Sequence, residues 1–120
     1  MRMWNVDPRL LCQRHLLGEH KELHMFVGAV QKGRSVAGFL YGLVDPHLVL
    51  VRHNELVGEM RRRGYRHDSP LDVSPQLLSE LFPGQYPVAT EEHNRAELAY
   101  RCQLCAKRQR GENKLVRWEE

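Results

Sequence analysis

The chain has 120 residues, a formal net charge of +3 and a hydrophobic fraction of 42%. This length leaves room for one domain and no second core, and the composition is that of a globular protein rather than a disordered one. No apolar run approaches the roughly 18–20 residues that span a bilayer. The first residues lack the apolar core of a signal peptide, and three cysteines are too few for a secreted disulfide framework. We therefore expect one soluble, cytoplasmic domain over residues 1–120, monomeric and without a membrane partner.

Start and stop signals predict four helices along the chain. The first runs over about residues 8–32, the second from residue 46 to about 63, the third from residue 75 to about 82, and the fourth from about 91 to 110. Each begins after a capping residue, often with proline next, and most end at glycine. The capping residues are Asp7, Asp45, Ser74 and Thr90, and the closing glycines are Gly33, Gly64, Gly84 and Gly111.

Two kinds of segment lie between these helices. Residues 67–73 and 84–89 are rich in Pro, Asp and Gly and are predicted to be loops. Residues 35–44 fit a short helix, a short strand or a buried loop equally well, because their apolar pattern has no clear period. The expected fold is all-α, a compact domain of about three to four helices with a long N-terminal helix.

Charge is unevenly distributed along the chain. Residues 67–94 carry five acidic side chains and no Lys or Arg, whereas residues 95–117 carry seven basic side chains against two acidic ones. Basic clusters of this kind suit a polyanion, because phosphate contacts release condensed counterions. The structural alternative is that arginines close helices and solubilise their faces. The candidates for contact with a nucleic-acid backbone are Arg61, Arg62, Arg63, Arg101, Lys107 and Arg108.

The first predicted helix carries two stripes at helical spacing. One is apolar and faces the core, and it contains Leu16, Leu23, Val27 and Val30. The other aligns two carboxylates with an imidazole, in the order Cys12, His15, Glu19, Glu22 and Phe26. This second stripe is either a polar face, solvated or paired with arginines of a neighbouring helix, or a catalytic one. If Glu22 lies on a basic, phosphate-binding surface, its carboxylate repels the phosphates. We therefore expect a Glu22 at such a surface to have a catalytic role.

The N-terminus can reach that carboxylate. Residues 1–7, if extended, span about 20 Å at roughly 3.3 Å per residue, and Glu22 lies a similar distance of about 20 Å along the helix at roughly 1.5 Å per residue. The amine of Met1 can therefore fold back to Glu22. Because Arg2 is large, we expect the initiator Met to be retained. An α-amine has a pKa near 8, so a fair fraction is neutral at about pH 7 and able to attack carbon.

The run from His15 to Leu23, followed by Gly28-Ala29-Val30, is similar to the pyrimidine-dimer DNA glycosylase/AP lyase family of the phage type. The similarity continues at Arg52, at residues 55–57, at Glu59 and at residues 63–65, and weakly at residues 84–86. The resemblance implies a compact helical fold and a DNA-repair enzyme that excises a damaged base and cuts the strand at the abasic site. Its partner would be double-stranded DNA containing a lesion or an abasic site, bent and with a nucleotide flipped out. No metal or cofactor is required.

Carried over by position, the resemblance assigns roles to five residues. Met1 supplies the nucleophilic α-amine that attacks the deoxyribose C1′, and Glu22 stabilises the developing positive charge and assists proton transfers. Arg2 holds a phosphate near the lesion, and His15 and Lys21 contact the sugar or the backbone. The chain also departs from the family pattern: Met25 replaces an arginine of the DNA interface, and an aromatic-rich C-terminal tail linked to lesion recognition is absent, with Trp118 as its only aromatic counterpart.

Two further motifs raise the question of a metal. Cys102-Gln103-Leu104-Cys105 is a single C-x-x-C that, with His93 or Cys12, has the ligand types of a zinc site. No second motif completes the set, so packed core thiols are the preferred interpretation. His20 and His24 are spaced i, i+4, but their sequence is not that of a zinc protease. The alternative function is a non-enzymatic helical module that binds nucleic acid or metal.

Overall fold

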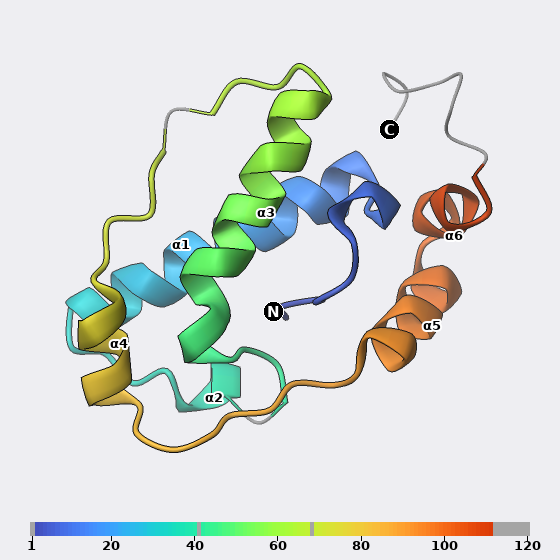
Figure 1. The fold of residues 1–120 in the computed structure, drawn as a ribbon. Helices are drawn as coiled ribbons and strands as arrows, with labels where there is room; N and C mark the ends of the chain where they lie inside the picture. Colours follow the sequence, from blue (N-terminus) through green and yellow to red (C-terminus); the bar gives the residue numbers. More distant parts are fainter. Residues whose placement is uncertain (1, 41, 68, 112–120) are drawn as a thin grey trace.

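The computed structural model describes residues 2–40, 42–67 and 69–111, and every regular element in these ranges is helical (Figure 1). Six α-helices and two short 3-10 helices (η1 and η2) follow one another. In chain order they are η1 (Pro8–Leu10), α1 (Gln13–Gln31), α2 (Ala37–Leu40), η2 (Pro46–Leu48), α3 (Val49–Arg62), α4 (Pro75–Leu81), α5 (Glu91–Arg101) and α6 (Gln103–Gln109). The all-α prediction and the long N-terminal helix are confirmed, and the ambiguous segment forms the short helix α2.

The four predicted capping residues all act as caps. Asp7 accepts a hydrogen bond from the Arg9 amide, Asp45 from His47, Ser74 from Gln76 and Leu77, and Thr90 from His93. Helix α1 ends where Gly33, at φ +70°, lets the Arg34 amide reach back to the Ala29 carbonyl. This is the reversal that a left-handed residue after a helix provides.

Two of the predicted helices are interrupted, which corrects their expected bounds. The first breaks after η1, where Leu11 and Cys12 are extended (ψ 134° and 168°) before α1 begins. The fourth breaks at Cys102, which is extended (φ −133°, ψ 113°) and separates α5 from α6. At the first break, tertiary contacts take main-chain groups: Arg63 donates to the Leu11 carbonyl, and the Cys12 amide donates to the Cys105 sulfur. At the second break, the tertiary contact is made by the side chain, because the Cys102 sulfur lies 3.7 Å from the Cys12 sulfur. Such contacts override local helix propensity.

The core lies where α1 packs against α3 (Figure 1). The apolar stripe of α1 is buried there, with Leu16 and Leu23 at 0% and 1% exposure, and Leu56 of α3 faces them from the same core. Phe26, which the sequence placed on the polar stripe, is also fully buried and makes edge contact with Phe39 of α2. No helix in the described ranges has the length and apolar character needed to cross a membrane.

The N-terminal segment, residues 2–11, runs between the α1–α3 pair and the α5–α6 pair (Figure 1). Its main-chain carbonyls are bound by side chains from the surrounding helices: Trp4 by Asn94 (2.7 Å), Val6 by Arg52 (2.6 Å), Arg9 by Arg108 (2.8 Å) and Leu11 by Arg63 (2.6 Å). Each donor is buried. Because buried polar groups are costly unless paired, these bonds fix the path of the segment.

Candidate active site

Glu22 lines a cavity of about 330 Å³ formed where the N-terminal segment meets α1, the α2–η2 loop and α5. The cavity has charged, aromatic and apolar walls. Its lining residues are Arg2, Trp4, His15, Glu22, Leu43 and Arg101. Four of the residues predicted as functional, Arg2, His15, Glu22 and Arg101, are therefore brought together from three elements.

The main chain of the N-terminal segment is bonded directly to the Glu22 carboxylate. The amide of Arg2 donates to Oε2 of Glu22 at 2.9 Å, and the next amide, of Met3, donates to the Leu43 carbonyl at 2.8 Å. Met1, the predicted nucleophile, lies outside the described residues. What the structure provides is the position of the residue bonded to it.

Asn94 of α5 binds the N-terminal segment at two points beside the cavity and was missed by sequence reasoning. It is fully buried, its amide nitrogen donates to the Trp4 carbonyl, and its Oδ1 accepts from the Arg2 guanidinium at 3.4 Å. That guanidinium also lies over the Trp4 ring, 4.6 Å from its centroid, in cation–π geometry. Nothing in the sequence around Asn94 signals this role, because its partners are some 90 residues away in the chain.

A second carboxylate at the cavity holds the two guanidiniums near each other. Glu97 pairs with Arg101 (2.9 Å) and lies 3.9 Å from Arg2. The Arg2 side chain is 19% exposed and the Arg101 side chain 55% exposed. The rim of the cavity thus offers two cations at different depths, which is an arrangement able to hold a phosphate.

Glu19, the other carboxylate of the polar stripe, forms a buried ion pair and so has a structural role. It is 2% exposed and forms a two-pronged ion pair with Arg52 of α3, with contacts of 2.5 and 3.0 Å. Burial raises the pKa of Glu19, while the hydrogen bonds from Arg52 act in the opposite direction. Because Arg52 also binds the Val6 carbonyl, this pair ties α1, α3 and the N-terminal segment together.

The remaining predicted DNA contacts divide into exposed and buried side chains. Lys21, Arg61 and Lys107 are exposed. Arg62 is exposed but pairs with Glu59 (2.5 Å). The structure does not place Arg63 and Arg108 at the surface: both are buried and bind main-chain carbonyls of the N-terminal segment, so we withdraw them from the proposed DNA contacts.

The cysteines and several histidines gather in two groups that have the composition of metal sites. The first, here called the cysteine cluster, consists of Cys12, His15, Cys102 and Cys105. The second, the histidine cluster, consists of His20, His24, His53 and His67. Within each group the potential ligand atoms lie within 4.8 Å of one another. His93, the alternative to Cys12 as a ligand beside the C-x-x-C motif, lies at the surface, 3.9 Å from Glu97.

In both clusters, side chains have pKa values shifted from their ordinary values. The hydrogen bond from Cys105 and the neighbouring His15 lower the pKa of the Cys12 thiol to about 3, against the effect of burial. The same contact with Cys12 raises the pKa of Cys105. Burial and the three neighbouring imidazoles lower the pKa of His20 to about 4. At neutral pH the His20 ring is therefore uncharged.

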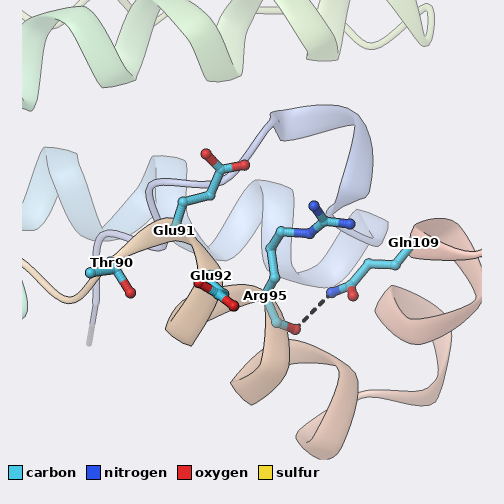
Figure 2. A pocket seen from close by; sticks show the side chains of 5 residues that line it. All are labelled: Thr90, Glu91, Glu92, Arg95 and Gln109. Atoms are coloured by element: carbon cyan, nitrogen blue, oxygen red, sulfur yellow. Dashed lines mark hydrogen bonds between the residues drawn. The ribbon is translucent and has the colours of Figure 1, made fainter.

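A larger cavity, of about 620 Å³, lies on the α5–α6 pair and shares no residue with the Glu22 cavity (Figure 2). Figure 2 shows Gln109 of α6 directed at the main-chain carbonyl of Arg95, to which it donates at 2.8 Å. Two glutamates, Glu91 and Glu92, line it against a single arginine. This charge balance disfavours a phosphate ligand, so the smaller Glu22 cavity is the better candidate for binding one.

The fold and this cavity define a small helical protein whose own N-terminal segment forms one wall of a carboxylate-containing site. The chain belongs to the pyrimidine dimer DNA glycosylase family, whose model matches residues 1–73. This match confirms the resemblance seen in the first helix. It covers Arg2, His15 and Glu22, whereas Asn94, Arg101 and the whole α5–α6 pair lie beyond it. No curated protein and no solved structure matches the chain.

Proposed function

We propose that the protein is a DNA-repair glycosylase with AP lyase activity, which uses the α-amine of Met1 as nucleophile and Glu22 as the acid/base group. The observation that carries this proposal is the 2.9 Å hydrogen bond from the Arg2 amide to Glu22. An α-amine is three covalent bonds from the next amide nitrogen, a separation of roughly 3–4 Å. Where the mature chain begins at Met1, that geometry supports an amine within reach of the carboxylate.

The proposed reaction has two stages at one sugar. The neutral amine attacks C1′ of the damaged nucleotide, the C1′–N glycosidic bond breaks, and the base leaves with the electron pair. The amine then loses a proton and the C1′–O4′ bond opens, giving an imine to the opened sugar. The negative charge of Glu22 stabilises the positively charged sugar as it forms, and its oxygens relay the protons.

Strand cleavage follows from the imine. The protonated imine acidifies the C2′ proton, and its removal expels the 3′ phosphate by β-elimination. Water then hydrolyses the imine and restores the amine. Arg2 and Arg101, at the rim of the cavity, are the proposed phosphate contacts, with Lys21 and Lys107 as exposed contributors. Reaching C1′ in a duplex requires a bent substrate with a flipped nucleotide.

Borohydride trapping on duplex DNA with an abasic site tests the nucleophile. The chain with a free Met1 amine and a C-terminal tag is expected to become covalently attached to the DNA. The same chain acetylated at Met1, or extended by an N-terminal tag, is expected not to be trapped. Peptide mapping of the trapped adduct should locate the sugar on Met1. Equal trapping of the free and blocked forms, or an adduct on a lysine, would contradict the proposal.

A further inference from the structure

We propose that the cysteine cluster is a structural zinc site that fastens the α5–α6 pair to the start of α1. Zn²⁺ in structural sites takes four ligands in a tetrahedron, and three thiolates with one imidazole is one of its usual sets. All three cysteines are buried and free of disulfides. The inference goes beyond the proposed function and does not depend on it.

The spacing of the ligand atoms fits a tetrahedron. With Zn–S near about 2.3 Å and Zn–N near about 2.0 Å, neighbouring ligands lie about 3.5–3.8 Å apart. Two of the separations fall in this range: the sulfurs of Cys12 and Cys102 are 3.7 Å apart, and Nδ1 of His15 lies 3.5 Å from the Cys105 sulfur. The distance from Nδ1 of His15 to the Cys12 sulfur, 3.2 Å, is slightly shorter. The three sulfurs and this nitrogen all lie within 4.8 Å of one another, as the ligands of one ion would.

The main chain around the cluster is shaped to present sulfur. The break between α5 and α6 contains neither Pro nor Gly, yet Cys102 adopts an extended conformation there. This conformation lets the Cys105 amide donate to the Cys102 sulfur at 3.4 Å, while the Cys12 amide donates to the Cys105 sulfur at 3.3 Å. Amide donors of this kind stabilise metal-bound thiolates from outside the coordination shell.

The position of the cluster links it to the Glu22 cavity. His15 contributes Nδ1 to the cluster while its ring lines the cavity, and Arg101, also in the cavity, directly precedes Cys102. Four protein ligands leave no open coordination position, which makes the ion structural rather than catalytic. The zinc would thus hold two walls of the cavity in place without touching the substrate.

Cobalt substitution tests the site in the full-length wild-type protein. Protein stripped of metal and reconstituted with Co²⁺ is expected to show thiolate-to-cobalt charge-transfer absorption and the intense visible bands of a tetrahedral ion. Added Zn²⁺ should displace the Co²⁺ and abolish these bands. X-ray absorption of the zinc form should show sulfur at about 2.3 Å. A wild-type protein that gives no cobalt–thiolate absorption and no zinc–sulfur scattering would overturn the proposal.

The variant Cys105→Ser, which removes one proposed ligand, tests the assignment of that residue. Where it folds, judged by its helical circular dichroism, it is expected to lose the charge-transfer absorption and one equivalent of bound zinc. Retention of the same absorption in a folded variant would overturn the assignment of Cys105. If the variant does not fold, the wild-type measurements decide.

The histidine cluster carries a second, independent inference. Nε2 of His24 and Nε2 of His53 are buried, and within the part of the chain that the structure describes neither atom makes a hydrogen bond of ordinary length and angle, although the main chain of Ser69 interacts with both rings. Buried polar nitrogens are rarely left without a partner in native proteins. We infer that these nitrogens, with those of His20 and His67, bind a divalent first-row transition-metal ion.

The geometry of the four rings supports this assignment. Two of them project one turn apart from α1, the third comes from α3 and the fourth from the segment after it. Nε2 of His20 and Nε2 of His67 face each other at 2.9 Å. Imidazole suits zinc, copper, nickel and iron. His53 and His67 also line a cavity of about 540 Å³, which provides access for the ion.

Metal stoichiometry separates the two clusters. Wild-type protein equilibrated with Zn²⁺ and desalted is expected to retain two ions per chain, whereas Cys105→Ser and His24→Gln should each retain one. X-ray absorption should then show about 1.5 sulfurs per zinc in the wild type, and nitrogen ligands alone in Cys105→Ser. One ion per chain in the wild type, with three sulfurs per zinc, would overturn the histidine site even if His24→Gln fails to fold.

Discussion

Glu22 is the side chain on which the proposed reaction depends, and its charge can be removed with little change of shape. In Glu22→Gln the amide oxygen can still accept the Arg2 amide, so the N-terminal segment is expected to stay in place. Loss of the negative charge should lower the single-turnover cleavage of abasic DNA by about 10²–10⁴-fold, the range typical of acid–base groups. The affinity for the DNA should change far less.

Cleavage rates and binding isotherms measured on the same duplex check this prediction. Glu80→Gln, on an exposed position of α4, is the matched control and should behave as the wild type. A Glu22→Gln protein that cleaves within a few-fold of the wild-type rate would remove the carboxylate from the mechanism.

Asn94 is expected to act by positioning the N-terminal segment. Asn94→Ala leaves the buried Trp4 carbonyl without its donor, which should reduce the free energy of unfolding by about 1–3 kcal/mol. The rate of borohydride trapping should fall more than DNA affinity does, since the nucleophile loses its alignment. Urea unfolding and trapping kinetics test both parts. Gln103→Ala, exposed on α6, is the control, and equal trapping by the two variants would show that Asn94 has only a structural role.

At the scale of the helices, local signals predicted beginnings well and interruptions poorly. Asp7, Asp45, Ser74 and Thr90 could be recognised as caps because their hydrogen bonds reach only two or three residues ahead. The breaks beside Cys12 and at Cys102 could not, because each depends on partners about 90 residues away. The same limit applies to the site: Glu22 followed from helix periodicity, whereas Asn94 required the folded chain.

The cap of α4 provides a quantitative test at this scale. Ser74 accepts from the amides of Gln76 and Leu77 at 3.1 and 3.3 Å. Ser74→Ala should therefore lower the free energy of unfolding by about 1 kcal/mol. Ser79→Ala, at an exposed position inside the same helix, should have a much smaller effect. Chemical denaturation of both variants measures the difference, and equal effects would contradict the capping role.

The end of α3 is joined to η1 through Arg63, and Glu59 pairs with this arginine, which makes stability there depend on pH. Burial alone would raise the pKa of Glu59, but hydrogen bonds from Arg62 and Arg63 lower it below its ordinary 4.5. A depressed carboxyl pKa adds stability above the unfolded value, and this contribution is lost as the pH falls through the folded value. Arg63 is buried and Arg62 largely exposed, so most of the contribution comes from Arg63.

Glu59→Gln should accordingly reduce the free energy of unfolding by about 3 kcal/mol near neutral pH. The difference from the wild type should be constant above about pH 5.5 and should shrink below about pH 4.5. Unfolding curves of both proteins across this range measure it. The exposed Glu92→Gln is the control. A difference that grows on acidification would have the wrong sign for a depressed pKa.

Considered as a whole, the described part of the molecule is assembled around residues 2–11. Side chains of α3, α5 and α6 bind carbonyls of this segment, so the helices and the N-terminus take up their positions together. Arg63 and Arg108, which the sequence suggested as contacts to a nucleic acid, are buried and bind carbonyls of this segment instead. The proposed nucleophile is thus attached to a segment that four buried side chains hold in place, which is the preorganisation that such a reaction requires.

Removal of metal is expected to weaken the attachment of the α5–α6 pair to the rest of the described chain. The pair is joined to the rest of the described chain through the Asn94 and Arg108 bonds, the packing of α6 on η1, and the cysteine cluster. A zinc ion whose dissociation constant lies well below the free zinc concentration stabilises the folded state by several kcal/mol. Chelation at neutral pH should therefore lower the thermal midpoint by about 10 °C or more. It should also expose the three cysteines to thiol reagents.

Cleavage of abasic DNA should fall together with that stability, because His15 and Arg101 lose their fixed positions while Met1 and Glu22 are chemically unchanged. Added Zn²⁺ should restore the midpoint, the protection of the thiols and the activity, whereas Mg²⁺ should restore none of them, since it prefers oxygen ligands. Trapping through the Met1 amine should persist at a reduced rate in the chelated protein. If chelation removes zinc yet leaves both stability and cleavage untouched, the ion does not hold the walls of the cavity, even though the amine and carboxylate chemistry would stand.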